Sequence, residues 1–87
     1  MKNQWGTIME TNNSVIEQLD KELQRKGFTS VLIERTKFLE LPWLNIIVYR
    51  GDKSIKLDMS VATLEKYGAD DMSRLIFKEF NRIHTYR

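Results

Sequence analysis

The stretch from Leu44 to Met59 constrains the fold most strongly, because it has the pattern of two antiparallel strands joined by a tight turn. An apolar run over residues 44–49 leads toward Gly51-Asp52. A glycine-first pair suits a two-residue turn, because glycine tolerates the positive φ that joins twisted strands. After the turn, polar and apolar residues alternate, so one face of the second strand should meet the core and the other should meet solvent. The predicted core-facing residues of that strand are Ile55, Leu57 and Met59.

A helix and a further strand are predicted before this hairpin. The run SVIE at residues 14–17 has the pattern of a capping box, in which serine and glutamate satisfy each other's backbone N–H groups. Apolar residues then recur at helical spacing and Gly27 is typical of a position just past a helix end, so we expect a helix over about 14–26. Residues 28–38 are rich in β-branched and aromatic side chains and predict the first strand, followed by a connection over 39–43.

Two helices are predicted after the hairpin. Ser60 suits the N-cap of a short helix that Gly68 ends. Asp70 and Asp71 then open a longer helix, where their charges favour the positive end of the helix dipole. Phe77 falls off the apolar stripe of that helix. The residues expected on its inner face are Met72, Leu75, Ile76, Phe80 and Ile83.

These elements predict an α+β fold: a helix, a three-stranded antiparallel sheet, a short helix and a long C-terminal helix, with the helices on one face of the sheet. A chain of 87 residues has room for one hydrophobic core. We therefore expect a single α+β domain over 14–87. A flexible N-terminal arm over 1–13 is expected before it, since that range is polar and has no sustained periodicity.

Composition argues against several classes of protein. The chain has no cysteine, which excludes disulfides and thiolate metal sites and favours a cytoplasmic location. The longest apolar run, residues 46–49, is far shorter than a membrane helix requires, and the N-terminus lacks the pattern of a signal peptide. We therefore expect neither secretion nor a membrane partner.

The sequence also lacks a group of residues that points to catalysis. Its single histidine, His84, lies near the C-terminus, where fraying works against fixed geometry. The adjacent Asp70 and Asp71 are better explained as helix N-terminal residues than as metal ligands. The four glycines are dispersed, so there is no glycine-rich phosphate loop. We expect a protein that is not an enzyme, with no catalytic residue, metal site or cofactor.

Nucleic-acid binding is one function that the charge pattern allows. The formal net charge of +2 is too small to indicate it, but Arg74, Lys78 and Arg82 recur along one side of the last predicted helix. A stripe of this kind suits either a phosphate footprint or an ordinary solvated helix face. With the turn residue of the hairpin included, the candidate nucleic-acid-binding residues are Lys53, Arg74, Lys78 and Arg82.

The predicted order of helix, three strands and helix is similar to that of the double-stranded-RNA-binding domain, a resemblance of topology. That family presents a lysine cluster at the start of its last helix and a first hairpin that contains Gly-Pro to the RNA. Here the last helix starts with ADDM at residues 69–72, and the first hairpin has LPW at residues 41–43. An acidic helix start repels phosphate, so the resemblance implies shared topology without the contact residues of that family.

Binding to another protein is the function that we expect first. The chain has more large apolar side chains outside its predicted core faces than so small a domain needs to bury. A module of this kind would act as an inhibitor, an adaptor or a regulator. The candidate protein-binding residues are Leu39, Leu41, Trp43 and Phe77, with Trp5 as a further aromatic anchor in the arm.

Size and composition are also typical of accessory proteins of bacteriophages and mobile elements, including blockers of host defence nucleases. Some anti-CRISPR proteins are similar in having a helix, three strands and further helices. At a net charge of +2, the chain is not expected to mimic DNA. A homodimer through an edge strand, most simply residues 28–38, is a further expectation, because an exposed strand edge must be covered or blunted.

Overall fold

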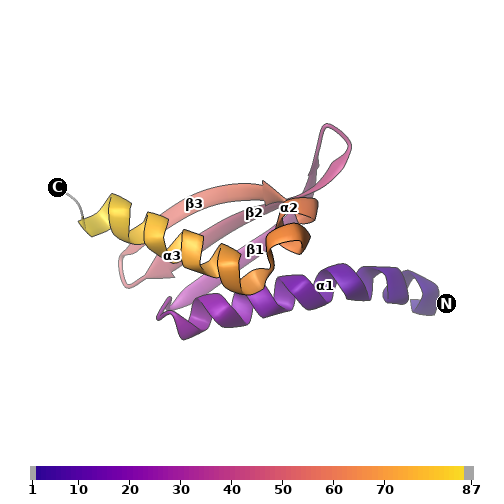
Figure 1. Ribbon diagram of the computed structural model, residues 1–87, viewed down its shortest axis with the longest axis horizontal. Helices are drawn as coiled ribbons and strands as arrows, with labels where there is room; N and C mark the ends of the chain where they lie inside the picture. The colour runs from indigo at the N-terminus through magenta and orange to yellow at the C-terminus, as the bar shows by residue number, and fades with distance from the viewer. Residues whose placement is uncertain (1, 86–87) are drawn as a thin grey trace.

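The computed structural model describes the backbone of residues 2–85 and the side chains of residues 14–84. It has one helix before a three-stranded antiparallel sheet and two helices after it (Figure 1), which confirms the predicted α+β fold. In chain order the elements are α1 (Lys2–Arg25), β1 (Ser30–Phe38), β2 (Leu41–Arg50), β3 (Lys53–Ser60), α2 (Val61–Tyr67) and α3 (Ala69–Thr85).

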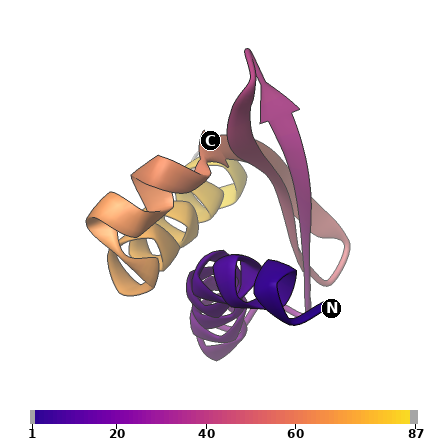
Figure 2. The same ribbon diagram turned by 90° about the vertical axis from the view of Figure 1, so that its right-hand side faces the viewer.

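The sheet is a meander in which β2 is the central strand, paired with β1 on one side and β3 on the other. Figure 2 shows the helices gathered on one face of this sheet, and no helix within residues 2–85 covers the opposite face. Successive residues of a strand point to opposite faces. Along β2, Leu44, Ile46 and Val48 therefore point toward the helices, and all three are fully buried.

The β2–β3 hairpin follows the predicted register. The two strands are joined by Gly51-Asp52, and Gly51 has a φ of 66°. A positive φ at the first turn residue is the geometry that glycine adopts at little cost. Ile55 and Met59 are buried and Leu57 is half-buried, whereas the intervening side chains of β3 are exposed. The predicted alternation along β3 is therefore confirmed.

The hydrophobic core fills the space between the helices and the inner face of the sheet. β1 begins two residues later than predicted, and Phe28, just before it, packs into this core. The C-terminal part of α1 lies beside α3, and the two helices contact each other. The buried hydrophobic residues are Leu19, Leu23, Phe28, Leu44, Ile46, Val48, Ile55, Met59, Val61, Leu64, Ala69, Met72, Ile76 and Phe80.

α1 is longer than predicted. It begins at Lys2, so Ser14 lies inside the helix, and the capping-box prediction was wrong as a start signal. A cap is worth only about 1 kcal/mol, and no proline between residues 2 and 25 interrupts the helix. The backbone of the predicted arm is thus helical from residue 2. The side chains of 1–13, including Trp5, lie outside the described residues, and the division into arm and domain stays a prediction.

The signals at both ends of α2 were predicted correctly. The hydroxyl of Ser60 accepts a hydrogen bond from the backbone N–H of Thr63 at 3.0 Å, as an N-cap does. Gly68 follows the helix with a φ of 89°, and its N–H donates to the carbonyl of Leu64 at 2.8 Å. These local hydrogen bonds fix both ends of the short helix that connects the edge strand β3 to α3.

The inner face of α3 is rotated relative to the prediction. Met72, Ile76 and Phe80 are buried as expected, but Leu75 is 55% exposed. The reason is that α3 packs against α1 as well as the sheet, so its buried stripe turns toward Phe77 and away from Leu75. Ile83 is also exposed, because it lies in the last turn beyond Phe80. The placement of Leu75 and Ile83 on the inner face was therefore wrong.

This rotation predicts opposite effects for two neighbouring substitutions. We expect Ile76→Ala to lower the free energy of unfolding by about 2–5 kcal/mol, because it leaves a cavity in the core. Leu75→Ala should change it by less than about 0.5 kcal/mol, because that side chain is largely in solvent. Urea denaturation followed by circular dichroism measures both. Equal losses for the two variants would contradict the rotated stripe.

Candidate functional site

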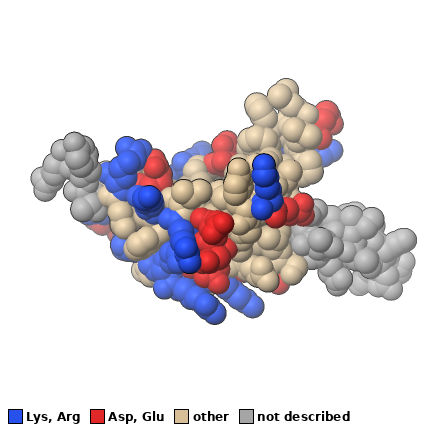
Figure 3. Space-filling model, in the orientation of Figure 1, with Lys and Arg blue, Asp and Glu red and all other residues tan. Residues whose placement is uncertain are grey.

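The β1–β2 hairpin projects beyond the rest of the sheet. β3 ends at Ser60, which pairs with Trp43, so the last two β1–β2 pairs have no third strand beside them. Figure 1 shows this end of the hairpin standing clear of the helices. We call residues 37–42 the hairpin tip. In Figure 3 it is largely free of charge, with an acidic and a basic group at its end.

The turn at the hairpin tip has a strained backbone. It consists of Leu39 and Glu40, with φ of 54° and 66°, and no other non-glycine residue among those described has a positive φ. Two consecutive positive φ values are typical of the type I′ turn, which favours Asn-Gly because a Cβ atom makes this region unfavourable for most residues. The cost of such a conformation is of the order of 1–3 kcal/mol per residue. This tip is therefore held in place by the strand pairing below it.

The strands reach further into the predicted connection over 39–43 than expected. Leu41, Pro42 and Trp43 belong to β2, and only two residues remain as turn. Pro42 is tolerated in a strand here because of its register. The residue pair that closes a two-residue turn is hydrogen-bonded, so the next pair, Lys37 and Pro42, is a non-hydrogen-bonded pair. A backbone N–H at position 42 would therefore point away from β1, toward the side where β3 has already ended. Proline, which has no N–H, loses no strand hydrogen bond there.

An apolar cluster covers the hairpin tip. Phe38 and Leu41 form a cross-strand pair and are 53% and 54% exposed, while Leu39 at the apex is 78% exposed. The rings of Phe38 and Trp43 lie 5.0 Å apart at 53°. We call Phe38, Leu39, Leu41 and Trp43 the tip cluster. Except for the apex, its side chains share the sheet face opposite the helices, because they alternate with the core-facing positions.

The same open face carries further apolar side chains below the tip. Leu32 pairs with Ile47 across β1 and β2, and Leu32 is 51% exposed. Beside the tip, a hollow of about 570 Å³ opens between the hairpin and the start of α2. Its lining comprises two basic residues, one acidic residue, one threonine and three apolar residues: Arg35, Thr36, Lys37, Glu40, Pro42, Trp43 and Val61.

The structure brings together three of the four predicted protein-binding residues. Leu39, Leu41 and Trp43 lie in the tip cluster, but Phe77 lies in α3 on the helical side of the molecule. Phe77 is half-buried, and its ring contacts Phe28 edge to face at 6.2 Å. It therefore packs against the hydrophobic core beside Phe28, apart from the other three residues, and its role in protein binding stays a prediction. Sequence analysis missed Phe38, whose contact with Trp43 depends on strand register.

The predicted phosphate-binding residues are less uniform than the sequence suggested. Arg74 forms an ion pair with Asp70 at 3.1 Å. Arg82 is paired with Glu79, with Nε donating to Oε1 at 3.1 Å, and this hydrogen bond lowers the pKa of the Glu79 carboxyl below its usual value. Both arginines thus have a carboxylate beside them. Lys53 lies at the start of β3, on a different element from the others.

A groove between α1 and α3 collects basic residues that the sequence did not connect. Arg25 and Lys26 from the end of α1 line it together with Arg74 and Lys78 from α3. The sequence showed Arg25 and Lys26 only as favourable charges near a helix C-terminus. No local signal links them to α3, because the packing of the two helices is a tertiary contact.

The side chains considered for catalysis or metal binding contact neighbouring groups in the structure. The Nε2 atom of His84 lies 2.7 Å from the carbonyl oxygen of Ser54, and its ring packs 4.6 Å from that of Phe80. Asp70 pairs with Arg74, as described above. Within the described part of the chain, no three His, Cys, Asp or Glu side chains come close enough to hold a metal ion. Nor does that part include a helix with the length and apolarity needed to cross a membrane.

Comparison of the chain with protein-family models, with curated proteins and with solved structures gave no match. What the described surface can bind therefore follows from its own geometry. Two surfaces stand out in that geometry. One is the apolar tip cluster at the end of the β1–β2 hairpin, and the other is the basic groove between α1 and α3.

The strained turn predicts that a favourable turn sequence would stabilise the protein. We expect Leu39→Asn combined with Glu40→Gly to raise the free energy of unfolding by about 1–2 kcal/mol, because Asn-Gly adopts the type I′ geometry with little strain. Loss of the Leu39 side chain should cost little, since it is 78% exposed. Urea denaturation of the double variant measures the gain. Unchanged or lower stability would show that the turn stores no strain.

Proposed function

We propose that this protein is a small, non-enzymatic, cytoplasmic module that binds another protein through its hairpin tip. The observation that carries the proposal is the tip cluster: exposed apolar side chains at the apex of a projecting and strained turn. Cytoplasmic location is supported by the absence of cysteine in a chain of this size.

The tip cluster has features that folding does not require. Leu39 at the apex makes no contribution to the core, and exposed apolar clusters on small proteins usually mark interaction sites. A polar Asn-Gly turn would close the same hairpin at lower cost. Strained backbone of this kind concentrates at functional positions. A partner that contacts Leu39 accounts for both its exposure and its strained backbone.

The geometry of the tip also supports tight binding. A two-residue turn closed by paired strands is already ordered, so little conformational entropy is lost on docking. Trp43 and Phe38 add aromatic surface of the type that dominates protein interfaces. Transfer of one exposed leucine side chain into a partner's apolar pocket is worth about 1.5–3 kcal/mol.

The shape and charge of this surface define the partner that would fit it. The convex apex suits an apolar pocket, and Lys37 and Glu40 beside it suit a rim that carries polar groups of both charges. A rigid projection that fills a pocket is suited to an inhibitor or regulator, including a phage-encoded blocker of a host defence protein. A second copy of the chain is the competing occupant, either at this surface or at the free edge of β1.

Site-specific photo-crosslinking in the producing cells tests the proposal directly. Replacement of Leu39 by p-benzoylphenylalanine should capture one defined protein, whereas the same replacement at Leu75 should not, although the two leucines are both exposed. No crosslinked protein, the same proteins from both positions, or capture of a second copy of this chain would each contradict the proposal.

With that partner purified, substitution of the apex gives a quantitative prediction. We expect Leu39→Ser to weaken binding by about 10- to 100-fold, the equivalent of losing one buried leucine side chain. Leu75→Ser is the matched control and should bind as the wild type does. Isothermal titration calorimetry measures both affinities, and equal affinities for the two variants would exclude the apex from the interface.

A further inference from the structure

The groove between α1 and α3 has an unusual composition. It has a volume of about 570 Å³, is open to solvent, and is lined by Arg25, Lys26, Arg74, Phe77, Lys78 and Asn81. Four of these six residues are basic and none is acidic. Figure 3 shows basic side chains gathered over this part of the molecule, where the end of α1 lies beside α3.

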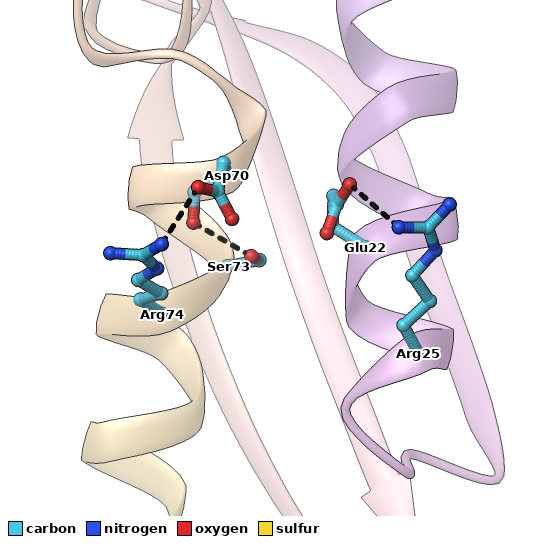
Figure 4. A network of polar contacts seen from close by, with 5 residues as sticks. All are labelled: Glu22, Arg25, Asp70, Ser73 and Arg74. Carbon is cyan, nitrogen blue, oxygen red and sulfur yellow. Dashed lines mark hydrogen bonds and ion pairs between the residues drawn. The ribbon is translucent and has the colours of Figure 1, made fainter.

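The nearest carboxylates lie toward a separate hollow. Glu22 is 3.7 Å from Arg25, and Asp70 is 3.1 Å from Arg74. Figure 4 shows that each of these ion pairs stays within its own helix. Both acids line a hollow closer to the start of α3, with Gln18, Lys21, Gly68 and Ala69. The groove itself thus keeps an excess of positive charge.

Two lysines of the groove carry that excess. No carboxylate with a described position lies within 4 Å of Lys26 or of Lys78, in contrast to the two arginines. Lys26 directly follows α1 and Lys78 lies in α3, and both line the same groove. A lysine ammonium is a strongly hydrated point charge that suits phosphate without requiring one fixed geometry.

Arg50 offsets a feature that would otherwise oppose anion binding in the groove. The C-terminal end of a helix carries partial negative charge, which would repel an anion near the end of α1. Here the guanidinium of Arg50 donates a hydrogen bond to the carbonyl of Lys26 at 3.0 Å. The same guanidinium lies 5.4 Å from the ring centroid of Phe77, which lines the groove. Arg50 thus satisfies one carbonyl just past the end of α1 and places a positive charge near that helix end.

We propose that this groove binds successive phosphates of a nucleic-acid strand, independently of the hairpin tip. A small phosphate ligand would require an enclosed pocket with converging donors, whereas this groove is open and its charges are distributed along two helices. That arrangement matches a continuous polyanion. Contacts to phosphates alone carry no sequence information, so binding should be non-specific with respect to sequence.

The location of the groove allows both surfaces to act at once. It lies on the helical side, and the hairpin tip stands at the opposite end of the molecule (Figure 1). The footprint differs from the predicted one, since Arg25 and Lys26 replace Lys53 and Arg82. Arg82 pairs with Glu79 and does not line the groove.

Fluorescence anisotropy with a labelled DNA duplex and the matching single strand tests the proposal. If two to four phosphates are neutralised, we expect the logarithm of the duplex association constant to fall with the logarithm of salt concentration with a slope of about −2 to −4. No binding at low salt, or binding that salt does not change, would overturn it. Inorganic phosphate can be added at a concentration equal to that of the phosphate groups in the DNA. If it displaces the DNA, the groove is a small-anion site, which would also overturn the proposal.

Charge reversal separates the groove from general electrostatic attraction. Lys26→Glu combined with Lys78→Glu should weaken binding by on the order of tenfold per lysine near 0.1 M salt and reduce the slope by about 2. Lys53→Glu combined with Lys56→Glu, on β3, makes the same change in net charge and should have a much smaller effect. Equal losses for the two double variants would show that net charge alone attracts the strand. Leu39→Ser should leave DNA binding unchanged, which keeps this outcome separate from that of the proposed protein interface.

Discussion

The burial of β2 between two neighbouring strands and under three helices is the constraint on which the rest of the structure depends. Three side chains of β2 are fully buried: Leu44, Ile46 and Val48. Each of them pairs with an apolar residue on at least one neighbouring strand. A slip of one residue in this strand would turn all three side chains toward solvent. The register of both hairpins is therefore fixed by the core, and with it the geometry of the two turns.

That fixed register explains how an unfavourable turn persists at the hairpin tip. The β1–β2 pairing continues past the end of β3, and the two residues left between the strands must then adopt positive φ values. The strain at Leu39 and Glu40 is balanced by strand pairing and by core packing several residues away. The same extension lifts Phe38 and Leu41 away from the body of the protein. A recognition surface is thus built by pairing geometry, without a flexible loop.

Arg50 connects the end of the central strand to the helical side of the molecule. Its guanidinium lies over the rings of Phe28, Phe77 and Phe80 at 5.3–5.4 Å and bonds to the end of α1. These contacts hold α1 and α3 in the relation that places Lys26 beside Lys78 in one groove. The two candidate surfaces therefore rest on the same central strand, one at each end of it.

The amino-acid sequence by itself determined the elements whose signals are local: the Gly51-Asp52 turn, the alternation along β3, the caps of α2 at Ser60 and Gly68, and the α+β order. These depend on φ preferences, side-chain alternation and bonds between near neighbours, which a sequence displays directly. Tertiary structure alone decided which flank of α3 is buried, because the contact with α1 turned the stripe toward Phe77 and away from Leu75. It also decided that Leu41, Pro42 and Trp43 belong to a strand, and that residues far apart in the chain meet at the tip cluster and the groove. The physical reason is that burial and charge clustering depend on which surfaces come together, and that is set by the packing of the whole chain.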